Sequence, residues 1–195
     1  MTFGKNTLVI GDVGVGKTTY LQKNLEGVDG VYWLALGTPV PTDVAGTSVW
    51  NYKQWLDVAK LPELKAAKVL VLDGLSNLQG LLLAGVLMTG KNAGGNPEQK
   101  DYGSAAYQLY QGFLLVGALG KPMHASLLTR EKTVGKGEAA KIETELFLAP
   151  QVQGFILPSF PAAAYITMKV LAGEAKYAVQ ENPVLAKQLI SAKVK

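Results

Sequence analysis

The sequence predicts an α/β fold: a mainly parallel central sheet with helices on both faces and a β-hairpin near the C-terminus. Short β-branched apolar runs alternate with helical stretches along most of the chain, and the first run (TLVI, Thr7–Ile10) leads directly into a glycine-rich turn. The stretch 164–182 reads as two strands around an Ala-Gly-Glu turn. Alternating strands and helices are typical of parallel sheets, and the hairpin adds antiparallel strands.

Each expected element follows from its local pattern. The apolar runs predict buried strands at residues 7–10, 31–36, 68–74 and 122–128, with 47–52 as a short edge strand. Helices are expected at 17–25, 53–60, 75–88, 104–119 and 181–195. Polar glycine-containing stretches predict long loops at 91–103 and 129–145. Because we find no internal repeat and no linker, we expect residues 1–195 to form a single domain.

Composition excludes several kinds of site. A chain of 195 residues, 48% hydrophobic and 17% charged, is able to bury one full core. The absence of cysteine excludes disulfides, cysteine-ligated zinc and thiol catalysis, and a single histidine excludes a multi-histidine metal site. That residue, His124, lies in the middle of an apolar strand, where we expect a buried or interface side chain without chemistry.

The sequence also bears on membranes and on acidic partners. Residues 146–168 carry no charge, but Pro150, Pro158 and Pro161 favour a turning core segment over a membrane span. The glycine-rich turn at residue 11 leaves no room for a signal peptide, so we expect a cytoplasmic protein. The net charge of +4 is modest, and only one of the 19 basic residues is an arginine.

The eight residues GDVGVGKT, 11–18, match the phosphate-loop pattern G-x-x-x-x-G-K-[ST] between a strand and a helix. Glycines let successive backbone N–H groups point into one concavity, and the helix that follows adds its positive N-terminus. Lys17 would reach the β- and γ-phosphates, and Thr18 would supply a hydroxyl to Mg²⁺. The expected contacts to the nucleotide are Gly11, Asp12, Val13, Gly14, Val15, Gly16, Lys17, Thr18 and Thr19.

Asp73 closes the clearest buried strand, KVLVLDG. Ligands of open α/β sheets bind beyond the carboxyl ends of the strands, so Asp73 would lie beside the phosphate loop if its strand neighbours the first. A carboxylate there holds Mg²⁺, usually through water. An exposed aspartate that merely ends a strand is the alternative.

The residue that activates water for hydrolysis is harder to identify. Many related ATPases place a glutamate directly after the magnesium aspartate, where this chain has Gly74. The turn after the second strand offers Asp43, which is also a natural turn- or helix-capping residue. Ser76 and Asn77 are weaker candidates for polarising a water molecule.

Thr129 and Arg130 follow the strand PMHASLL and should project from the same edge of the sheet. A polar residue there senses the γ-phosphate, and an arginine neutralises charge within the subunit or across a subunit boundary. Because Arg130 is the only arginine, any arginine finger supplied by this chain is Arg130. A surface ion pair is the alternative role.

Three other nucleotide-binding classes fit less well. A GTPase needs D-x-x-G near Asp73 and an N-K-x-D base reader, and neither is present. A small-molecule kinase closes an arginine-rich lid, which one arginine cannot form. The segment LSNLQG (Leu75–Gly80) follows the magnesium strand, whereas the similar signature of ABC-type ATPases precedes it.

Several segments of the chain resemble the RecA-like ATPases encoded by bacteriophages, some of which act in single-strand annealing. These segments are GDVGVGKTTYL, VLVLDGLSNL, the DYG before a long helix, PMHASLLTREK and the C-terminal hairpin with ENPVLAKQL. The resemblance covers most of the chain. It implies ATP and Mg²⁺ as cofactors, nucleotide contacts from the phosphate loop, magnesium at Asp73 and γ-phosphate sensing near Thr129. The missing glutamate departs from this pattern and points to slow hydrolysis.

The resemblance also implies partners. In RecA-like folds, loops after the central strands face single-stranded DNA, and here these are 91–103 and 130–141. Their DNA-binding candidates are Lys91, Lys100, Tyr102, Arg130, Lys132, Lys136 and Lys141. A homo-oligomeric ring or filament, and other phage or host recombination proteins, are expected partners. A nucleotide-gated interaction protein without a DNA role, or a small-molecule phosphotransferase, remains an alternative.

Overall fold

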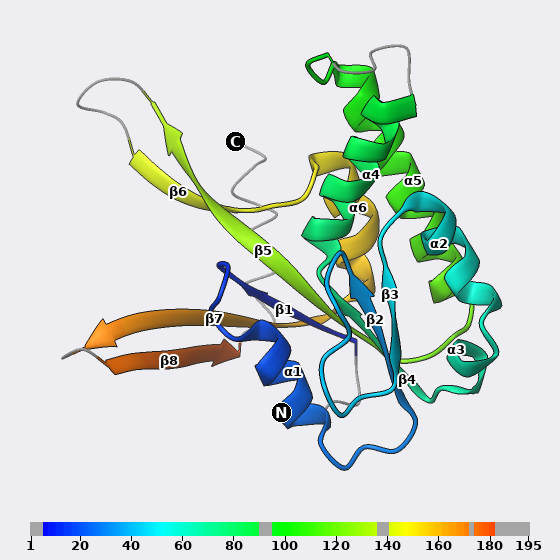
Figure 1. Ribbon diagram of the computed structural model, residues 1–195. Coiled ribbons are helices and arrows are strands. Elements are labelled where there is room, and N and C mark those ends of the chain that lie inside the picture. The colour runs from blue at the N-terminus through cyan, green and yellow to red at the C-terminus, as the bar shows by residue number, and fades with distance from the viewer. Residues whose placement is uncertain (1–5, 90–94, 136–140, 172–173, 182–195) are drawn as a thin grey trace.

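The computed structural model describes residues 6–89, 95–135, 141–171 and 174–181. Within them an eight-stranded sheet has the order β3-β2-β4-β5-β1-β7-β8, with β6 paired to β5 (Figure 1). The strands are β1 (Thr7–Gly11), β2 (Val31–Leu36), β3 (Gly46–Val49), β4 (Val69–Asp73), β5 (Met123–Val134), β6 (Lys141–Leu146), β7 (Ala162–Leu171) and β8 (Glu174–Glu181). Pairing is parallel from β3 through β7 and antiparallel for β5–β6 and β7–β8, which confirms the expected mainly parallel sheet.

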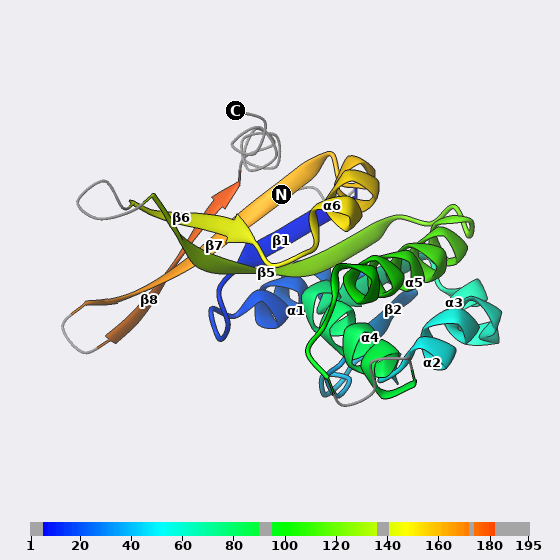
Figure 2. The ribbon, with the colours of Figure 1, turned by 90° about the horizontal axis from the view of Figure 1, so that it is seen from above.

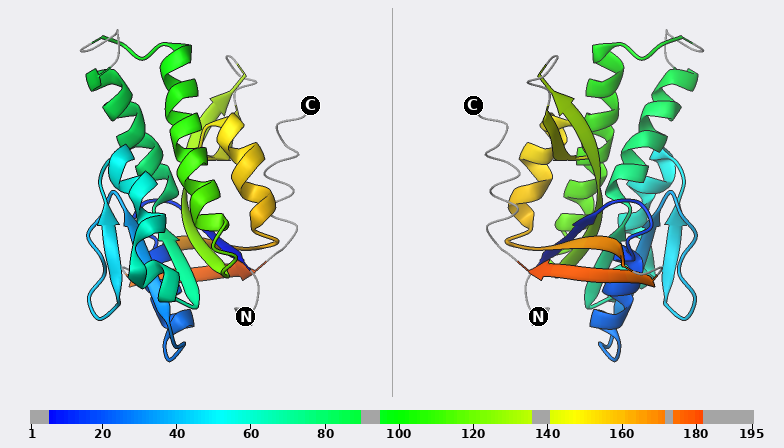
Figure 3. Two further views of the ribbon diagram at one scale, coloured as in Figure 1. Left: turned by 90° about the vertical axis from the view of Figure 1, so that its right-hand side faces the viewer. Right: turned by 90° about the vertical axis from the view of Figure 1, so that its left-hand side faces the viewer.

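Helices cover both faces of this sheet, as predicted. They are α1 (Lys17–Leu25), α2 (Tyr52–Asp57), α3 (Pro62–Ala66), α4 (Leu75–Thr89), α5 (Gln99–Gly117) and α6 (Pro150–Ile156), with short 3₁₀ turns at Val58–Lys60 and Leu157–Ser159. Seen from above, α2 to α5 form one group and α1 lies nearer to β1 (Figure 2). The long helices α4 and α5 run side by side (Figure 3).

The strands are apolar on both sides because each side packs against helices. In β1, Leu8 and Ile10 belong to the larger core cluster beneath α2 to α6, and Val9 belongs to a smaller cluster with Leu21 and Leu25 of α1. Leu70 and Leu72 of β4 face the larger cluster in the same way, and Val71 faces the smaller one. This alternation determines which side of the sheet each strand residue faces.

The sequence misplaced the start of α5. The loop expected at 91–103 ends early, because Glu98 and Asp101 form a capping box in which the backbone N–H of Glu98 donates to Asp101 Oδ2 at 2.8 Å. The helix therefore begins at Gln99, and the expected loop residues Lys100 and Tyr102 lie on its first turn. Residues 90–94 lie outside the described part of the chain.

The loop expected at 129–145 was also wrong. β5 continues to Val134 and pairs with β6, with Thr129 opposite Leu146 and Val134 opposite Lys141. Charged and β-branched side chains in this stretch suit a solvent-exposed antiparallel hairpin as well as a loop, and the pairing with β6 decides between the two. In Figure 1 this hairpin and the β7–β8 hairpin both extend away from the helices. The β7–β8 hairpin was expected.

Smaller differences concern the region before β4 and the C-terminus. The edge strand expected at 47–52 is β3 and ends at Val49, because Asn51 accepts a hydrogen bond from the backbone N–H of Gln54 and caps α2. The helix expected at 53–60 divides into α2 and a 3₁₀ turn, and α3 follows. The helix expected at 181–195 falls outside the described residues apart from Glu181, which ends β8.

A helix that crosses a membrane must be long and apolar, and none of the helices in the described ranges is long and apolar enough.

Candidate nucleotide-binding site

The phosphate loop connects β1 to α1 with the backbone that its glycines allow. Gly14 and Gly16 have φ values of 77° and 83°, in the left-handed region that favours glycine, and Gly16 is the N-cap of α1. A Cβ atom on Gly11 would lie 2.5 Å from the carbonyl oxygen of Ile166, so β7 packs directly against the start of the loop. The chain therefore forms an open turn before a helix N-terminus, which suits an anion.

Lys17 lies over this loop. It is 8% exposed, and its Nζ donates hydrogen bonds to the carbonyl oxygens of Gly11, at 3.0 Å, and Asp12, at 2.5 Å. Burial lowers the pKa of Lys17, and the carboxylates of Asp73 and Asp12 oppose this shift. The ammonium group is thus held at the mouth of the loop, where the sequence analysis placed the β- and γ-phosphates.

Thr18 and Asp73 meet at the same edge of the sheet. The hydroxyl of Thr18 donates to Asp73 Oδ2 at 2.7 Å, and Asp73 is 6% exposed. We had expected Asp73 to reach the loop only if its strand, β4, were next to β1. The two strands are not neighbours, because β5 lies between them. Helix α1 contacts both β1 and β5, and its first turn brings Thr18 across the intervening strand to the end of β4.

Ser126 is a member of this site that the sequence analysis missed. It lies on β5, next to Asp73, since Ala125 is in register with Leu72. Its hydroxyl donates to Asp73 Oδ1 at 2.5 Å and accepts the backbone N–H of Gly74 at 2.8 Å. A single serine within the apolar strand PMHASLL was the available signal, but one polar residue in a strand does not identify its partner.

The donors at this edge fit a magnesium ion. Thr18 contributes a hydroxyl oxygen and Asp73 a carboxylate, and both are the hard oxygen ligands that Mg²⁺ takes in proteins. A cluster of three or more acidic, histidine or cysteine side chains is absent from the described residues. Phosphate oxygens and water would therefore complete the coordination, as is usual for Mg²⁺ bound with a nucleotide.

A second polar contact joins the phosphate loop to β5. The hydroxyl of Thr129 donates to Asp12 Oδ1 at 2.7 Å, and Thr129 is buried. Tyr165 of β7 contacts this pair. Burial, and then the charge of Asp12, raise the pKa of Tyr165, whereas its hydrogen bond with Thr129 lowers it. The residue expected to sense the γ-phosphate therefore contacts the loop that would bind it.

The backbone favours glycine at Gly74, the position directly after Asp73, and at Gly37. Gly74 has a φ of 101°, and a Cβ atom there would lie 2.6 Å from the carbonyl oxygen of Leu36. Gly37, which follows β2, has a φ of 70°, and a Cβ atom would lie 2.9 Å from Leu81. Both backbone positions disfavour any side chain, so the missing glutamate follows from the geometry of these strand ends.

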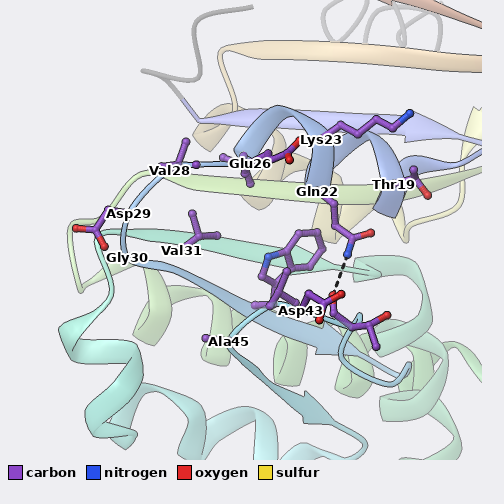
Figure 4. A pocket seen from close by; sticks show the side chains of 15 residues that line it. Thr19, Gln22, Lys23, Glu26, Val28, Asp29, Gly30, Val31, Asp43 and Ala45 are labelled. Carbon is purple, nitrogen blue, oxygen red and sulfur yellow. Dashed lines mark hydrogen bonds between the residues drawn. The ribbon is translucent and has the colours of Figure 1, made fainter.

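Asp43 lies in a different place from the phosphate loop. It lines a cavity of about 580 Å³ beside α1, and the Gln22 side chain points toward its turn (Figure 4). The Gln22 side chain donates to the carbonyl oxygen of Thr42 at 3.4 Å, which ties this turn to the helix. The cavity lining includes neither residues 11–18 nor Asp73. Ser76, the weaker candidate, accepts the backbone N–H of Leu128 at 3.1 Å.

Arg130 is held within its own hairpin. Its Nε and Nη2 atoms approach Glu145 Oε1 at 2.7 and 2.6 Å, and its guanidinium lies over the ring of Phe147, 5.2 Å from the centroid. Because neighbouring side chains in a strand point to opposite sides, Arg130 points away from Thr129. The surface ion pair weighed in the sequence analysis is therefore present.

The candidate DNA-binding residues divide into three groups. Tyr102, Arg130 and Lys132 line one groove of about 1050 Å³, between the second and third turns of α4, the first turn of α5 and the β5–β6 hairpin. Lys100 is absent from this lining and pairs with Glu98 at 2.8 Å. Lys91 and Lys136 lie outside the described residues, and Lys141 is placed only by its register in β6.

His124 is fully buried, as expected, and burial lowers its pKa to about 4.

Comparison with known proteins identifies the fold. No family model matches the sequence, and no curated protein matches it either. Among solved structures, the flagellar accessory protein FlaH from Methanocaldococcus jannaschii is 13% identical, with a TM-score of 0.53 over 91% of this chain and 77% of FlaH. A KaiC-like protein from the hyperthermophilic archaeon Pyrococcus horikoshii is 14% identical, with a TM-score of 0.51 over 92% of this chain and 78% of that one. The chain has the RecA-like α/β fold that these structures share.

Proposed function

We propose that this protein binds ATP together with Mg²⁺ and hydrolyses it slowly. The single observation that carries the proposal is the convergence of Lys17, Thr18 and Asp73 at one edge of the sheet. The Lys17 ammonium lies over the open loop, and the Thr18 hydroxyl is 2.7 Å from Asp73. These groups come from two elements separated by 55 residues, which an isolated glycine-rich turn would not bring together.

In this proposal the residues of the chain have distinct roles. Backbone N–H groups of the loop and the N-terminus of α1 bind the phosphates, and Lys17 adds a positive charge on the β- and γ-phosphates. Thr18 and Asp73 hold the magnesium ion, which neutralises phosphate charge when bound. Thr129 contacts Asp12 and is near enough to the loop to respond to a γ-phosphate. Asp43 remains a candidate for orienting water only if its turn moves toward the phosphates.

The first experiment measures ATP binding and turnover with and without Mg²⁺. Wild-type protein should bind a fluorescent ATP analogue more tightly with Mg²⁺ and release phosphate at a low rate. Asp73→Asn should lose most of the magnesium dependence and retain metal-independent binding. Equal binding with and without Mg²⁺ in wild-type protein would contradict the proposed site. Preference for ATP over GTP is measured in the same assay.

We also propose that the protein acts on single-stranded DNA, in recombination or annealing, as a homo-oligomeric ring or filament in the cytoplasm. The observation that favours DNA is the groove in which Tyr102, Arg130 and Lys132 lie together with Phe147. Exposed aromatic rings stack on bases, each for about 1–3 kcal/mol, and cations follow the backbone. Glu145 in the same groove opposes this, because it already pairs with Arg130.

The DNA proposal needs its own test. Fluorescence anisotropy with labelled oligonucleotides at low salt should detect binding, and Tyr102→Ala should weaken it. Tyr107→Ala is a matched control, since Tyr107 is an exposed tyrosine on the same helix and does not line the groove. If turnover and anisotropy do not respond to DNA, a nucleotide-gated interaction protein becomes the better interpretation. A small-molecule phosphotransferase would instead transfer phosphate to an acceptor in a substrate screen.

A further inference from the structure

The carboxylate of Asp73 is held from both sides. Thr18 donates to Oδ2 at 2.7 Å, and Ser126 donates to Oδ1 at 2.5 Å. Thr18 is a first-turn residue of α1 and lies in the expected path of the nucleotide. Ser126 lies on the floor of the site, in the central part of the sheet, and is 2% exposed.

The Ser126 hydroxyl makes two hydrogen bonds in this arrangement. While its hydroxyl donates to Asp73, its oxygen accepts the backbone N–H of Gly74 at 2.8 Å. Gly74 has a φ of 101°, so the chain turns sharply directly after the carboxylate. One side chain on β5 thus holds both the acid and the turn that follows it.

We propose that Ser126 is the positioning residue for the magnesium-binding carboxylate. By holding Oδ1, it orients Oδ2 toward Thr18 and the phosphate loop, so that the metal meets a carboxylate already in place. Ser126 acts through Asp73 and does not itself touch the nucleotide. This inference rests on the proposed function, because it concerns the same metal site.

The physical expectation is a change in metal affinity and not in nucleotide affinity. Hydrogen-bond partners behind a metal ligand typically change metal affinity by about 10- to 100-fold when they are removed. Ser126→Ala leaves the Asp73 carboxylate held only through Oδ2, by Thr18, and removes the acceptor of the Gly74 N–H. The phosphate loop, with Lys17, is not altered by this change.

The experiment titrates Mg²⁺, and Mn²⁺ detected by electron paramagnetic resonance, into protein with a non-hydrolysable ATP analogue. Ser126→Ala should raise the half-saturating metal concentration about 10-fold or more. Its affinity for the analogue in excess chelator should stay within about 2-fold of wild type, because no phosphate contact is removed. Thr7→Val is the matched control, since Thr7 is also 2% exposed but lies at the opposite end of β1. It should leave both affinities unchanged.

Two results would overturn the inference: unchanged metal dependence in Ser126→Ala, or an equal loss of affinity with and without metal. Ser126→Cys keeps a similar volume with a weaker donor, so it covers the case in which the alanine variant does not fold. Ser126→Cys should raise the half-saturating metal concentration by a smaller factor than Ser126→Ala. A half-saturating concentration equal to that of wild type in Ser126→Cys would also overturn the inference. Absence of metal dependence in wild-type protein would instead refute the proposed function itself.

Discussion

The two halves of β5 contrast within a single strand. Residues Met123–Leu128 pair in the parallel sheet, and Thr129 is the first residue paired with β6; these residues are buried except for the half-buried Leu128. Residues 130–134 of the hairpin with β6 are all exposed. In the first half, Ser126 and Thr129 each have a defined partner at the phosphate site. In the second half, Arg130 pairs with Glu145 while its side chain is 56% exposed.

This difference shows that a buried polar contact is stronger evidence for a functional site than an exposed one. A buried hydroxyl needs its partner, because leaving a buried polar group unpaired costs about 1–3 kcal/mol. An exposed ion pair contributes only about 0–1 kcal/mol and rearranges readily. The contacts of the buried half therefore define a site, and those of the exposed half describe a surface able to change its partners.

The largest effect is expected at Lys17, a buried residue of the same candidate site. Lys17→Ala removes the ammonium group above the loop and should weaken ATP binding by about 100- to 1000-fold, about 3–4 kcal/mol. The fold should persist, as checked by circular dichroism. Lys23→Ala, an exposed lysine in the last turn of the same helix, should bind ATP normally. If Lys17→Ala bound ATP as tightly as wild type, the assignment of the nucleotide-binding site would be wrong.

The next prediction concerns His124, in the buried half of β5. Burial lowers its pKa from 6.5 to about 4, so the folded protein keeps it neutral where the unfolded chain takes up a proton. Stability is therefore retained above about pH 6.5 and declines as the pH falls toward 4. Between pH 7.5 and 4.5 this residue should cost about 2–3 kcal/mol of unfolding free energy.

Urea denaturation at both pH values measures this loss. His124→Leu should show a smaller decrease than wild type over the same range, because the variant has no imidazole to protonate. An identical pH dependence in the two proteins would show that His124 is not the group responsible. It would also weaken the contrast between the two halves of β5.

Thr129→Val tests the last residue of the buried half. The change removes the hydroxyl that donates to Asp12 and keeps the volume of the side chain. We expect turnover to fall about 10-fold, or about 1.4 kcal/mol, with ATP affinity nearly unchanged. Thr133→Val, on the exposed half of the strand, serves as the control. A loss of affinity without a loss of turnover would assign Thr129 to ground-state binding instead.

The smallest effect is expected at Arg130. Arg130→Ala breaks an ion pair in which the arginine side chain is 56% exposed and the Glu145 side chain 10% exposed. Stability should change by about 1 kcal/mol, because Lys132 remains 3.8 Å from Glu145, and ATP binding should survive. If DNA binds in the groove, affinity should fall a few-fold and depend less on salt. Turnover should also fall if Arg130 acts across a subunit boundary, and mixing with Lys17→Ala subunits should then restore it. Failure to restore turnover would contradict an across-subunit role.

Sequence patterns predicted the parts of this site that depend on local structure. The phosphate loop was recognisable because its glycines, Lys17 and Thr18 are consecutive, and its strand and helix flank it directly. Asp73 was recognisable because it ends a buried strand. The parallel sheet and the C-terminal hairpin followed from the alternation of apolar runs. Glu98 and Asp101 were missed because acidic residues in a polar stretch suit a loop as well as a capping box.

The amino-acid sequence by itself determined a glycine-rich loop with Lys17 and Thr18 between a strand and a helix, and an acid at a strand end, since both are properties of short contiguous segments. Only the tertiary structure decided that β5 lies between β1 and β4, and that it brings Ser126 to Asp73 and Thr129 to Asp12. It also decided that Gly74 cannot readily be exchanged for a glutamate, because Leu36 of another strand occupies that space. Strand order and close approach depend on packing between residues far apart in the chain, which no local pattern records.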